Sequence, residues 1–302
     1  MSSNDDIPNL GIGFIGLGVL GTGLSLALAH SGHRVVGTHS RTPESAVWAA
    51  QRIKGCQVFS HAQELCDKVD LVFITTPDVV IGKVVSEISW RPGQGVVHCC
   101  GVAGEELLEQ AAVQGAVTGA FHPCQTFACL DEPAEALDRL KGVTFAVAGN
   151  GWVLEYLRAL AAGLGGYPIE VPDGQRPLYH AASVMACGHL AALLNGAVRA
   201  WEEMGFTQEE AVRALYPLCR STLDNVASHG PVSAATGPVM RGDTATVKTH
   251  QEALAGRLDD LTPQYAELTR ASLPIARTKG LAESQIDEIR DLLESMRQAG
   301  KH

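Results

Sequence analysis

A glycine-rich turn near the N-terminus is the segment best suited to chemistry. An apolar run, Leu10–Ile15, precedes it, and an Ala/Leu-rich stretch, Val19–Ala29, follows it. In a strand–turn–helix setting the first glycine permits a tight turn, the second lets the backbone approach a pyrophosphate, and the third lets helix and strand pack closely. Free N–H groups at the helix N-terminus favour the anion. The expected dinucleotide contacts are Gly16, Leu17, Gly18, Val19, Leu20 and Gly21. The alternative is a glycine-rich turn that binds nothing.

The end of the next expected strand, Arg34–Thr38, indicates which dinucleotide fits. NAD sites usually carry Asp or Glu about 20 residues after the glycines, where it accepts a hydrogen bond from the ribose 2′-hydroxyl. Here the strand ends in Arg41 flanked by Ser40 and Thr42. A guanidinium between two hydroxyls suits a 2′-phosphate, so the sequence favours NADPH over NADH. The alternative is that Arg41 is a solvated surface charge near Glu44.

Composition limits the partners. The chain has 302 residues, enough for two domains, and its net charge of −10 argues against nucleic acid. Its 8 cysteines include no CxxC pair, and Met1–Pro8 has no basic or apolar region typical of a leader, so we expect a cytoplasmic protein with reduced thiols. The apolar stretch Ala181–Val198 contains His189 and Asn195 and is short for a bilayer. We expect a buried core helix and no membrane partner.

The first half alternates strands and helices, which predicts an α/β fold with a doubly wound parallel sheet. Ligands bind such sheets at the carboxyl ends of the strands. The expected strands are Leu10–Ile15, Arg34–Thr38, Leu71–Ile74, Gly95–Cys99, Ala116–Ala120, Thr144–Ala148 and an edge strand Tyr167–Val171. The expected helices are Val19–Ser31, Pro43–Ile53, Val79–Ile88, Glu105–Gln114 and Trp152–Leu164.

The second half is expected to be all-helical, with residues 1–172 forming the dinucleotide domain and 173–302 the helical domain. Thr207 and Glu210 have the spacing of a capping box. The expected segments are a long helix Tyr179–Met204, a helix from Thr207 toward Asn225, a loop His229–Asp243, helices Thr244–Leu258 and Pro263–Ala276, and a tail helix Ala282–Gln298 with Ile286, Ile289, Leu293 and Met296 on one stripe.

Polar residues follow three further strands of the expected sheet. Thr75, Thr76 and Pro77 close one strand, and their backbone and hydroxyls are expected beside the cofactor. Cys100 closes the next strand, where a nicotinamide ring would lie. A thiol there would react only if ionised, and His98 is the one sequence neighbour that could carry positive charge. The alternative is that Cys99 and Cys100 are small packing residues.

Histidines and one charged pair are the remaining catalytic candidates. His122 follows another strand end, where it could donate a proton near neutral pH, the alternative being a histidine held by backbone in a turn. His180 opens the helical half, and Arg241 could clamp a substrate carboxylate. Asp243 could orient that substrate or cap the following helix. His122, His180, His250 and Asp243 have no recognised ligand spacing, so no metal site is expected.

Taken together, these segments resemble one family. They are Gly16–Gly21, Thr76-Pro77-Asp78, His122-Pro123, Tyr179-His180-Ala181-Ala182, Thr236-Gly237-Pro238 and Arg241-Gly242-Asp243. The chain resembles Rossmann-like proteins with a helical C-terminal domain of unknown function, in the superfamily of 6-phosphogluconate dehydrogenase, pyrroline-5-carboxylate reductase and ketopantoate reductase. The resemblance implies an NADP-linked fold and a 6-phosphogluconate-dehydrogenase-like helical domain that forms homodimers. Relatives tend to have serine at Cys100 and asparagine at Gly188. In the better-known enzymes of the superfamily, a Lys and an Asn on the corresponding helix help to handle the substrate, and no such pair stands near Tyr179–Gly188.

Two functional hypotheses follow. The first is an NADPH-dependent oxidoreductase that reduces a C=O or C=N bond of a small, carboxylate-bearing substrate held between the domains. His122 or His180 would be the acid, and Arg241 the anion clamp. The second is an NADP-binding sensor or scaffold without catalysis. The absent Lys/Asn pair favours the second hypothesis, and the histidines at strand ends favour the first.

Overall fold

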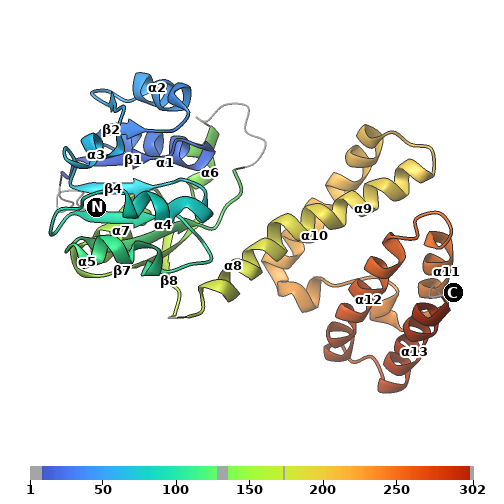
Figure 1. Cartoon of the computed structure of the whole chain (residues 1–302). Helices are drawn as coiled ribbons and strands as arrows, with labels where there is room; N and C mark the ends of the chain where they lie inside the picture. The colour runs from blue at the N-terminus through green and yellow to red at the C-terminus, as the bar shows by residue number, and fades with distance from the viewer. Residues whose placement is uncertain (1–8, 128–134, 173, 300–302) are drawn as a thin grey trace. The chain divides into compact units, whose positions relative to one another are not determined.

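The chain divides into two compact units, Met1–Cys187 and Gly188–His302 (Figure 1). The structure is a computed structural model and describes residues 9–127, 135–172 and 174–299. The expectation for Met1–Pro8 and the side chain of Met296 lie outside the described residues. The first unit ends later than residue 172 because helix α8 (Arg176–Val184) contacts the sheet's strand ends. The functional division at 172 stays a prediction.

One sheet forms the centre of the first unit. Within the described residues its strand order is β3-β2-β1-β4-β5-β6-β7-β8. Strands β1 and β4 are buried at every position, as apolar strands covered on both faces must be. The bounds are β1 Ile12–Ile15, β2 Val35–His39, β3 Gln57–Val58, β4 Leu71–Ile74, β5 Gly95–His98, β6 Val117–Pro123, β7 Thr144–Gly149 and β8 Tyr167–Glu170.

Helices cover both faces of this sheet, which confirms the doubly wound arrangement (Figure 1). One core contains side chains of α1, α2 and α7, and the other contains side chains of α3, α4 and α5. The bounds are α1 Val19–His30, α2 Pro43–Arg52, α3 Ala62–Cys66, α4 Asp78–Ser86, the 3₁₀ helix η2 Glu105–Leu108, α5 Glu109–Val113, α6 Glu135–Leu140 and α7 Gly151–Gly163.

One strand pair departs from the expected parallel arrangement. Strands β6 and β7 run antiparallel, with Gly119 opposite Gly149 and Pro123 opposite Phe145, whereas the other pairs in the sheet are parallel. Alternation of strands and helices predicts parallel pairing but does not fix each strand's direction. Strand β3 and helices α3 and α6 are additional elements, too short to produce a clear periodic pattern.

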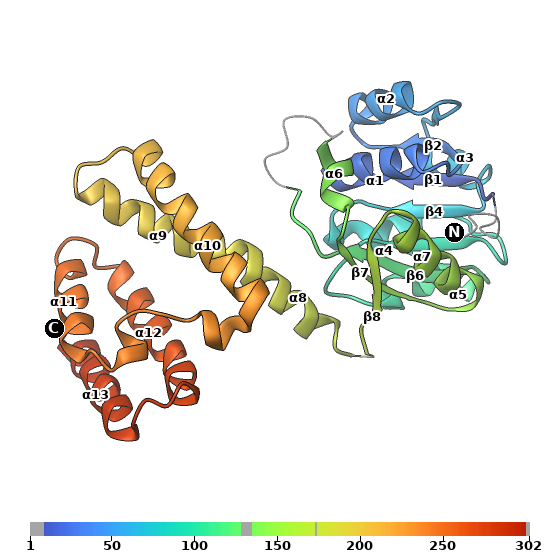
Figure 2. The same ribbon diagram turned by 180° about the vertical axis from the view of Figure 1, so that it is seen from behind.

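Helices make up the second unit, as expected. The capping box is confirmed, since Thr207 Oγ1 accepts from Glu210 N and Glu210 accepts from Thr207 N. Helix α10 packs along α9 (Figure 2). The expected loop His229–Asp243 is wrong at its start, because α10 continues through a kink at Gly230 to Ala234. The bounds are α9 Leu190–Glu203, α10 Gln208–Ala234, the 3₁₀ helix η4 Val239–Arg241, α11 Thr244–Leu254, α12 Leu261–Thr278 and α13 Glu283–Ala299.

The expected long helix after residue 178 is continuous but locally altered. It comprises α8, a π-helical turn η3 (Met185–His189) and α9. The stretch Arg176–Glu203 is long and apolar enough for a membrane span by length and composition alone, since it contains an 18-residue window with a mean hydropathy of 1.5. Only 6% of that apolar window is buried, so the expected buried core helix is wrong for this chain by itself. Too few other elements cover its apolar side chains.

Candidate functional site

The glycine turn between β1 and α1 has the geometry that each glycine position requires. Gly16 has φ +96°, and a Cβ there would lie 2.7 Å from Thr76 N. A Cβ on Gly21 would lie 2.2 Å from the Gly16 carbonyl oxygen, so helix and turn pack too closely for a side chain. A Cβ on Gly18 would meet nothing within 4 Å. The middle glycine therefore borders open space, as approach of a ligand to the backbone requires.

The first turn of α1 supplies hydrogen-bond donors to this space. Gly18 is the N-cap residue, so no side-chain hydrogen bond caps the helix, and no acidic residue lies in its first turn. The first N–H groups of a helix lack intrahelical acceptors, so those of Val19 and Leu20 remain available to an anion. Leu17 is buried and anchors the turn in the core. The residues present therefore fit a pyrophosphate.

The end of β4 fixes the turn from the neighbouring strand. Thr75 N donates to the Ile15 carbonyl at 2.9 Å, and Thr75 Oγ1 donates to the Gly16 carbonyl. Thr76 Oγ1 is buried and has no partner among the described residues. Pro77 is the N-cap residue of α4. An orphaned hydroxyl beside the glycine turn is the kind of group that a bound ligand satisfies.

The end of β2 leaves one guanidinium unpaired. Ser40 Oγ accepts from Thr42 N at 3.2 Å, which orders the residues around Arg41. His39 Nδ1 lies 3.0 Å from the Phe59 carbonyl oxygen and is used locally. Arg41 is exposed and forms no ion pair within the described part of the chain, with Glu44 or any other carboxylate. The 2′-phosphate role of Arg41 stays a prediction.

The end of β5 is built around a neutral histidine. His98 is fully buried, and its Nε2 donates to the Gly104 carbonyl at 2.8 Å while its Nδ1 accepts from Cys100 N at 3.0 Å. Burial lowers the pKa of His98 to about 4. His98 is therefore uncharged near neutral pH and holds the backbone of Cys100–Gly104. It supplies no positive charge to a neighbouring thiol.

The two adjacent thiols are accordingly unreactive. Burial raises the pKa of Cys99 and of Cys100 above the ordinary thiol range. Both side chains are buried, Cys99 in the core that includes α1 and Cys100 in the core on the other face of the sheet. The packing interpretation of the pair therefore fits the structure. Contact of Cys100 with a cofactor stays a prediction.

Two of the predicted acids meet at the end of β6. The ring centroids of His122 and His180 are 5.9 Å apart, and His122 Nδ1 lies 2.8 Å from Tyr179 Oη. A Cβ on Gly101 would lie 2.7 Å from His122 Nε2 and 2.6 Å from His180 Cδ2. The glycine thus admits both rings. We name His122, Tyr179, His180 and Gly101 the histidine cluster.

The histidine cluster is electrically unusual. Burial, followed by the nearby His180 and Arg176, lowers the pKa of His122 to about 4. Burial, followed by Cys124, raises the pKa of Tyr179 well above its usual range. Near neutral pH His122 is therefore a neutral imidazole and Tyr179 a neutral phenol. Each can still donate or accept one hydrogen bond.

The predicted residues of the second unit have local roles. Asp243 is the N-cap of α11, since its carboxylate accepts from Thr246 N at 3.0 Å and from Thr246 Oγ1 at 2.6 Å. These bonds lower the pKa of Asp243. Arg241 is exposed on η4. His250 Nδ1 lies 2.8 Å from Tyr265 Oη. Substrate roles for Arg241 and Asp243 stay predictions.

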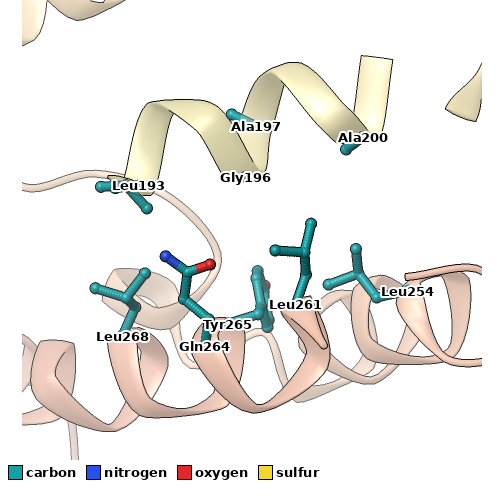
Figure 3. A pocket seen from close by; sticks show the side chains of 9 residues that line it. All are labelled: Leu193, Gly196, Ala197, Ala200, Leu254, Leu261, Gln264, Tyr265 and Leu268. Carbon is teal, nitrogen blue, oxygen red and sulfur yellow. The ribbon is translucent and has the colours of Figure 1, made fainter. Parts of the chain in front are cut away.

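An apolar pocket lies elsewhere in the second unit, between α9 and α12 (Figure 3). Its volume is about 190 Å³. Leu193 and Ala197 of α9 face Leu261, Gln264 and Leu268 of α12 across it. The part of the chain that the structure describes contains no group of three metal-ligating side chains.

Sequence reasoning did not assign the roles of three residues of the site. They are Tyr179, which bonds His122, the structural His98, and Arg176, which donates to the Cys100 carbonyl at 3.3 Å. Tyr179 has a signal in the sequence, because it stands beside His180 at the start of an apolar helix. Arg176 has a weaker one, as the lone cation before that helix. Nothing in the sequence indicates that His98 is buried.

Comparisons with known proteins agree with this architecture. Residues 1–123 match a Rossmann-like domain, and residues 143–272 match a domain of unknown function, DUF2520. No match was found among the curated proteins. The described sheet and helices therefore define a Rossmann-type class of fold with a helical second part. More narrowly, the chain carries a Rossmann-like domain followed by a DUF2520 domain.

Solved structures share this fold along nearly the whole chain. A provisionally assigned NADP oxidoreductase from Bacteroides fragilis is 24% identical, with a TM-score of 0.72, 88% of this chain covered and 98% of the other. A reductive aminase from Aspergillus terreus, in complex with NADPH and ethyl-5-oxohexanoate, is 14% identical, with a TM-score of 0.68 and coverages of 92% and 98%. A 1-pyrroline-5-carboxylate reductase from Streptococcus pyogenes is 15% identical, with a TM-score of 0.61 and coverages of 90% and 100%.

Proposed function

We propose that the protein is an NADPH-dependent oxidoreductase that reduces a C=O or C=N bond of a small, carboxylate-bearing substrate. One observation carries the proposal: the open glycine turn and the histidine cluster follow strands of one parallel array, β1-β4-β5-β6. Parallel strands end at the same edge of a sheet, where α/β proteins bind their ligands. NADPH complexes of the reductive aminase, which has this fold, add support.

The nucleotide would be held by the residues at that edge. The pyrophosphate fits the open space at Gly18 and the N-terminus of α1. Arg41, with Ser40 and Thr42, would bind the 2′-phosphate, and the Thr76 hydroxyl would gain the partner it lacks. When bound, the cofactor supplies a hydride to the substrate carbon.

The histidine cluster would supply the proton. His122 Nδ1 lies 2.8 Å from Tyr179 Oη, and in the tautomer with Nδ1–H the imidazole would donate to the phenol, so that the phenol hydrogen could turn to the substrate's oxygen or nitrogen. Tyr179 stays protonated until that atom gains negative charge or basicity, because its pKa is raised. Arg176 lowers the pKa of Tyr179 and therefore favours release of the proton. In this scheme His122 positions the phenol of Tyr179. His180 lies beside His122 in the same cluster.

The experiment combines nucleotide binding with turnover. NADPH is titrated by fluorescence, and small ketones, 2-oxo acids and cyclic imines are screened for loss of reduced-cofactor absorbance. We expect Tyr179→Phe to lower kcat about 100-fold, within the usual range for a lost general acid, while NADPH affinity is kept. Tyr167→Phe, on the exposed strand β8, is the matched control. Tight NADPH binding without turnover of any probe would support the sensor hypothesis instead.

We also propose that the protein is a homodimer through its helical unit. Leu193 on α9 and Tyr216, Leu218 and Leu223 on α10 are large apolar side chains exposed to solvent. Large apolar side chains that gather on an exposed surface are typical of protein interfaces, and homodimer interfaces are rich in them. Ionised side chains are interspersed along α10, including the ion pair Arg220–Asp224, and these disfavour a lipid bilayer.

The dimer is tested by sedimentation velocity at micromolar protein. Leu218→Glu combined with Leu223→Glu should convert the dimer to a monomer, because both charges would be buried at the interface. Val113→Glu, at an exposed position on α5, is the control and should leave the dimer intact. A wild-type protein that sediments as a monomer would refute the proposal.

A further inference from the structure

Arg176 is a buried cation without a carboxylate partner. Its side chain is 5% exposed at the start of α8. Nη2 donates to the Cys100 carbonyl at 3.3 Å, whereas Nε and Nη1 have no hydrogen-bond partner among the described residues. A buried charge without compensation costs several kcal/mol. Folded proteins rarely keep such a group unless something else binds it.

The charges around Arg176 do not neutralise it. Glu106 is a carboxylate whose charge raises the pKa of Arg176, yet its Oε1 accepts from Gly104 N at 2.8 Å and it forms no ion pair with Arg176. His98 and His122 are neutral near pH 7, and each is disfavoured as a cation by Arg176. Asp78 and Glu106 act on the same histidines with the opposite sign, so Arg176 is a cation that faces the histidine cluster without an ion pair among the described residues.

Two glycines, Gly101 and Gly104, lie in the backbone segment beside Arg176, and the carboxylate of Glu106 lies against Gly104, with Oε2 2.7 Å from the position of a Cβ there. Gly104 also stands next to Arg176, and a Cβ on Gly104 would lie 3.8 Å from Arg176 Cδ. Gly101 stands between the same segment and the rings of His122 and His180. Because glycine restricts the backbone least, segment 101–104 would have to shift to let an anion reach Arg176, and glycines at both its ends make such a shift less costly. Both positions are in the first unit, so the arrangement is complete there.

We propose that Arg176 binds the carboxylate of the substrate. This inference rests on the proposed function and deepens it, because it assigns the anion site to α8 rather than to Arg241. A carboxylate would accept charge-assisted hydrogen bonds from the donors that Arg176 leaves unpartnered. The bound anion would lie next to Tyr179 and His122, so it would place the adjacent C=O or C=N carbon at the proton donor. Substrates without a carboxylate would leave Arg176 unpaired.

The first experiment detects the anion at Arg176 itself and needs no turnover. Arginine Nε–H signals are recorded by NMR, and the signal of Arg176 is assigned by its loss in Arg176→Lys. Titration with formate should shift that signal saturably, whereas formamide, a neutral probe of similar size, should not. Inorganic phosphate is a second arm, and a larger shift with phosphate than with formate would assign the site to a phosphate group instead. No shift with either anion would overturn the proposal.

The second experiment measures specificity in the wild-type protein and its variants. 1-Pyrroline-5-carboxylate and 1-pyrroline differ by one carboxylate, so their ratio of kcat/KM reports its recognition. We expect Arg176→Met to lower that ratio about 10- to 100-fold through KM, the range for a lost charge-assisted hydrogen bond, and Arg176→Lys to restore part of it. Arg158→Lys, at an exposed ion pair in the same unit, is the control.

The two experiments separate this inference from the proposed function. A saturable formate shift without turnover of either imine would support the anion site and refute the reductase. Turnover with an unchanged ratio in Arg176→Lys and Arg176→Met would refute the anion site and keep the reductase. A Met variant that does not fold leaves the Lys variant and the wild-type formate titration to decide.

Discussion

Two glycines of the same turn should respond to alanine in opposite ways. Gly18 has φ −71° and ψ −172°, an extended conformation that alanine adopts without strain, and its Cβ would meet no atom of the chain within 4 Å. We therefore expect Gly18→Ala to change the free energy of unfolding by less than about 0.5 kcal/mol. The added methyl group occupies the space proposed for the pyrophosphate, so NADPH affinity should fall at least about 10-fold.

Gly21→Ala should instead destabilise the fold. Alanine is intrinsically favoured over glycine inside a helix by about 1 kcal/mol. The new Cβ would nevertheless lie 2.2 Å from the Gly16 carbonyl oxygen and 2.5 Å from Thr75 Oγ1, and neither belongs to a flexible side-chain end. Overpacking of this kind costs about 1–3 kcal/mol. Helix α1 must move away from the turn, so we expect a net loss of unfolding free energy and of NADPH binding together.

The assay pairs urea denaturation without nucleotide against NADPH fluorescence titration. The two variants serve as controls for each other, because only one of them is expected to alter the apo protein. A Gly18→Ala protein that binds NADPH as tightly as the wild type would refute the role of this turn. Loss of stability in Gly18→Ala would refute the open geometry itself.

Three further predictions concern charge. Arg41→Ala should weaken NADPH about 10-fold or more and leave NADH nearly unchanged, and equal losses in fluorescence titrations would exclude the 2′-phosphate role. The pKa of His98 is lowered to about 4 from 6.5, so the unfolded chain binds that proton first as pH falls. His98 should therefore lower the free energy of unfolding by up to about 3 kcal/mol between pH 6.5 and 4, and it should have no effect above pH 6.5. Urea denaturation across this pH range can check the prediction. Asp243→Ala should cost about 1 kcal/mol by loss of the α11 cap, whereas Asp243→Ser should keep most of it, and similar thermal stabilities of the two variants would contradict the cap.

The sequence predicts the sheet well where local patterns are strong. Strand Leu71–Ile74 has the expected bounds, and the glycine turn has the expected setting, because apolar runs and glycine positions are local signals. The reversal of β7 against β6 is not local, since it depends on the path between them. The exposure of Arg176–Glu203 also escapes the pattern, because an apolar helix looks the same whether its own chain or another molecule covers it.

The candidate site was predicted by position rather than by chemistry. The strand pattern predicts that His122 lies at a strand end, which the structure confirms at the end of β6, and His180 meets it from α8. The protonation states were not predictable, since they depend on burial and on Arg176, which lies far from His122 in sequence. Asp243 shows the converse case, because its capping role is a local pattern that the sequence contains.

The electrostatics of the histidine cluster restrict which group can act as the acid. An imidazolium at His122 would stand beside the buried guanidinium of Arg176, and both burial and that charge oppose it. Arg176 cannot relieve this repulsion by becoming neutral, because a guanidinium does not lose its proton in proteins. Under the proposed function this disfavours His122 as the acid and favours the phenol of Tyr179, 2.8 Å from His122 Nδ1. In the proposed reaction, the bound anion would raise the pKa of His122, so that His122 takes up a solvent proton on Nε2 as its Nδ1 proton passes to the phenolate of Tyr179 and stays neutral overall. If both proposals hold, binding of the carboxylate and transfer of the proton are coupled through Arg176.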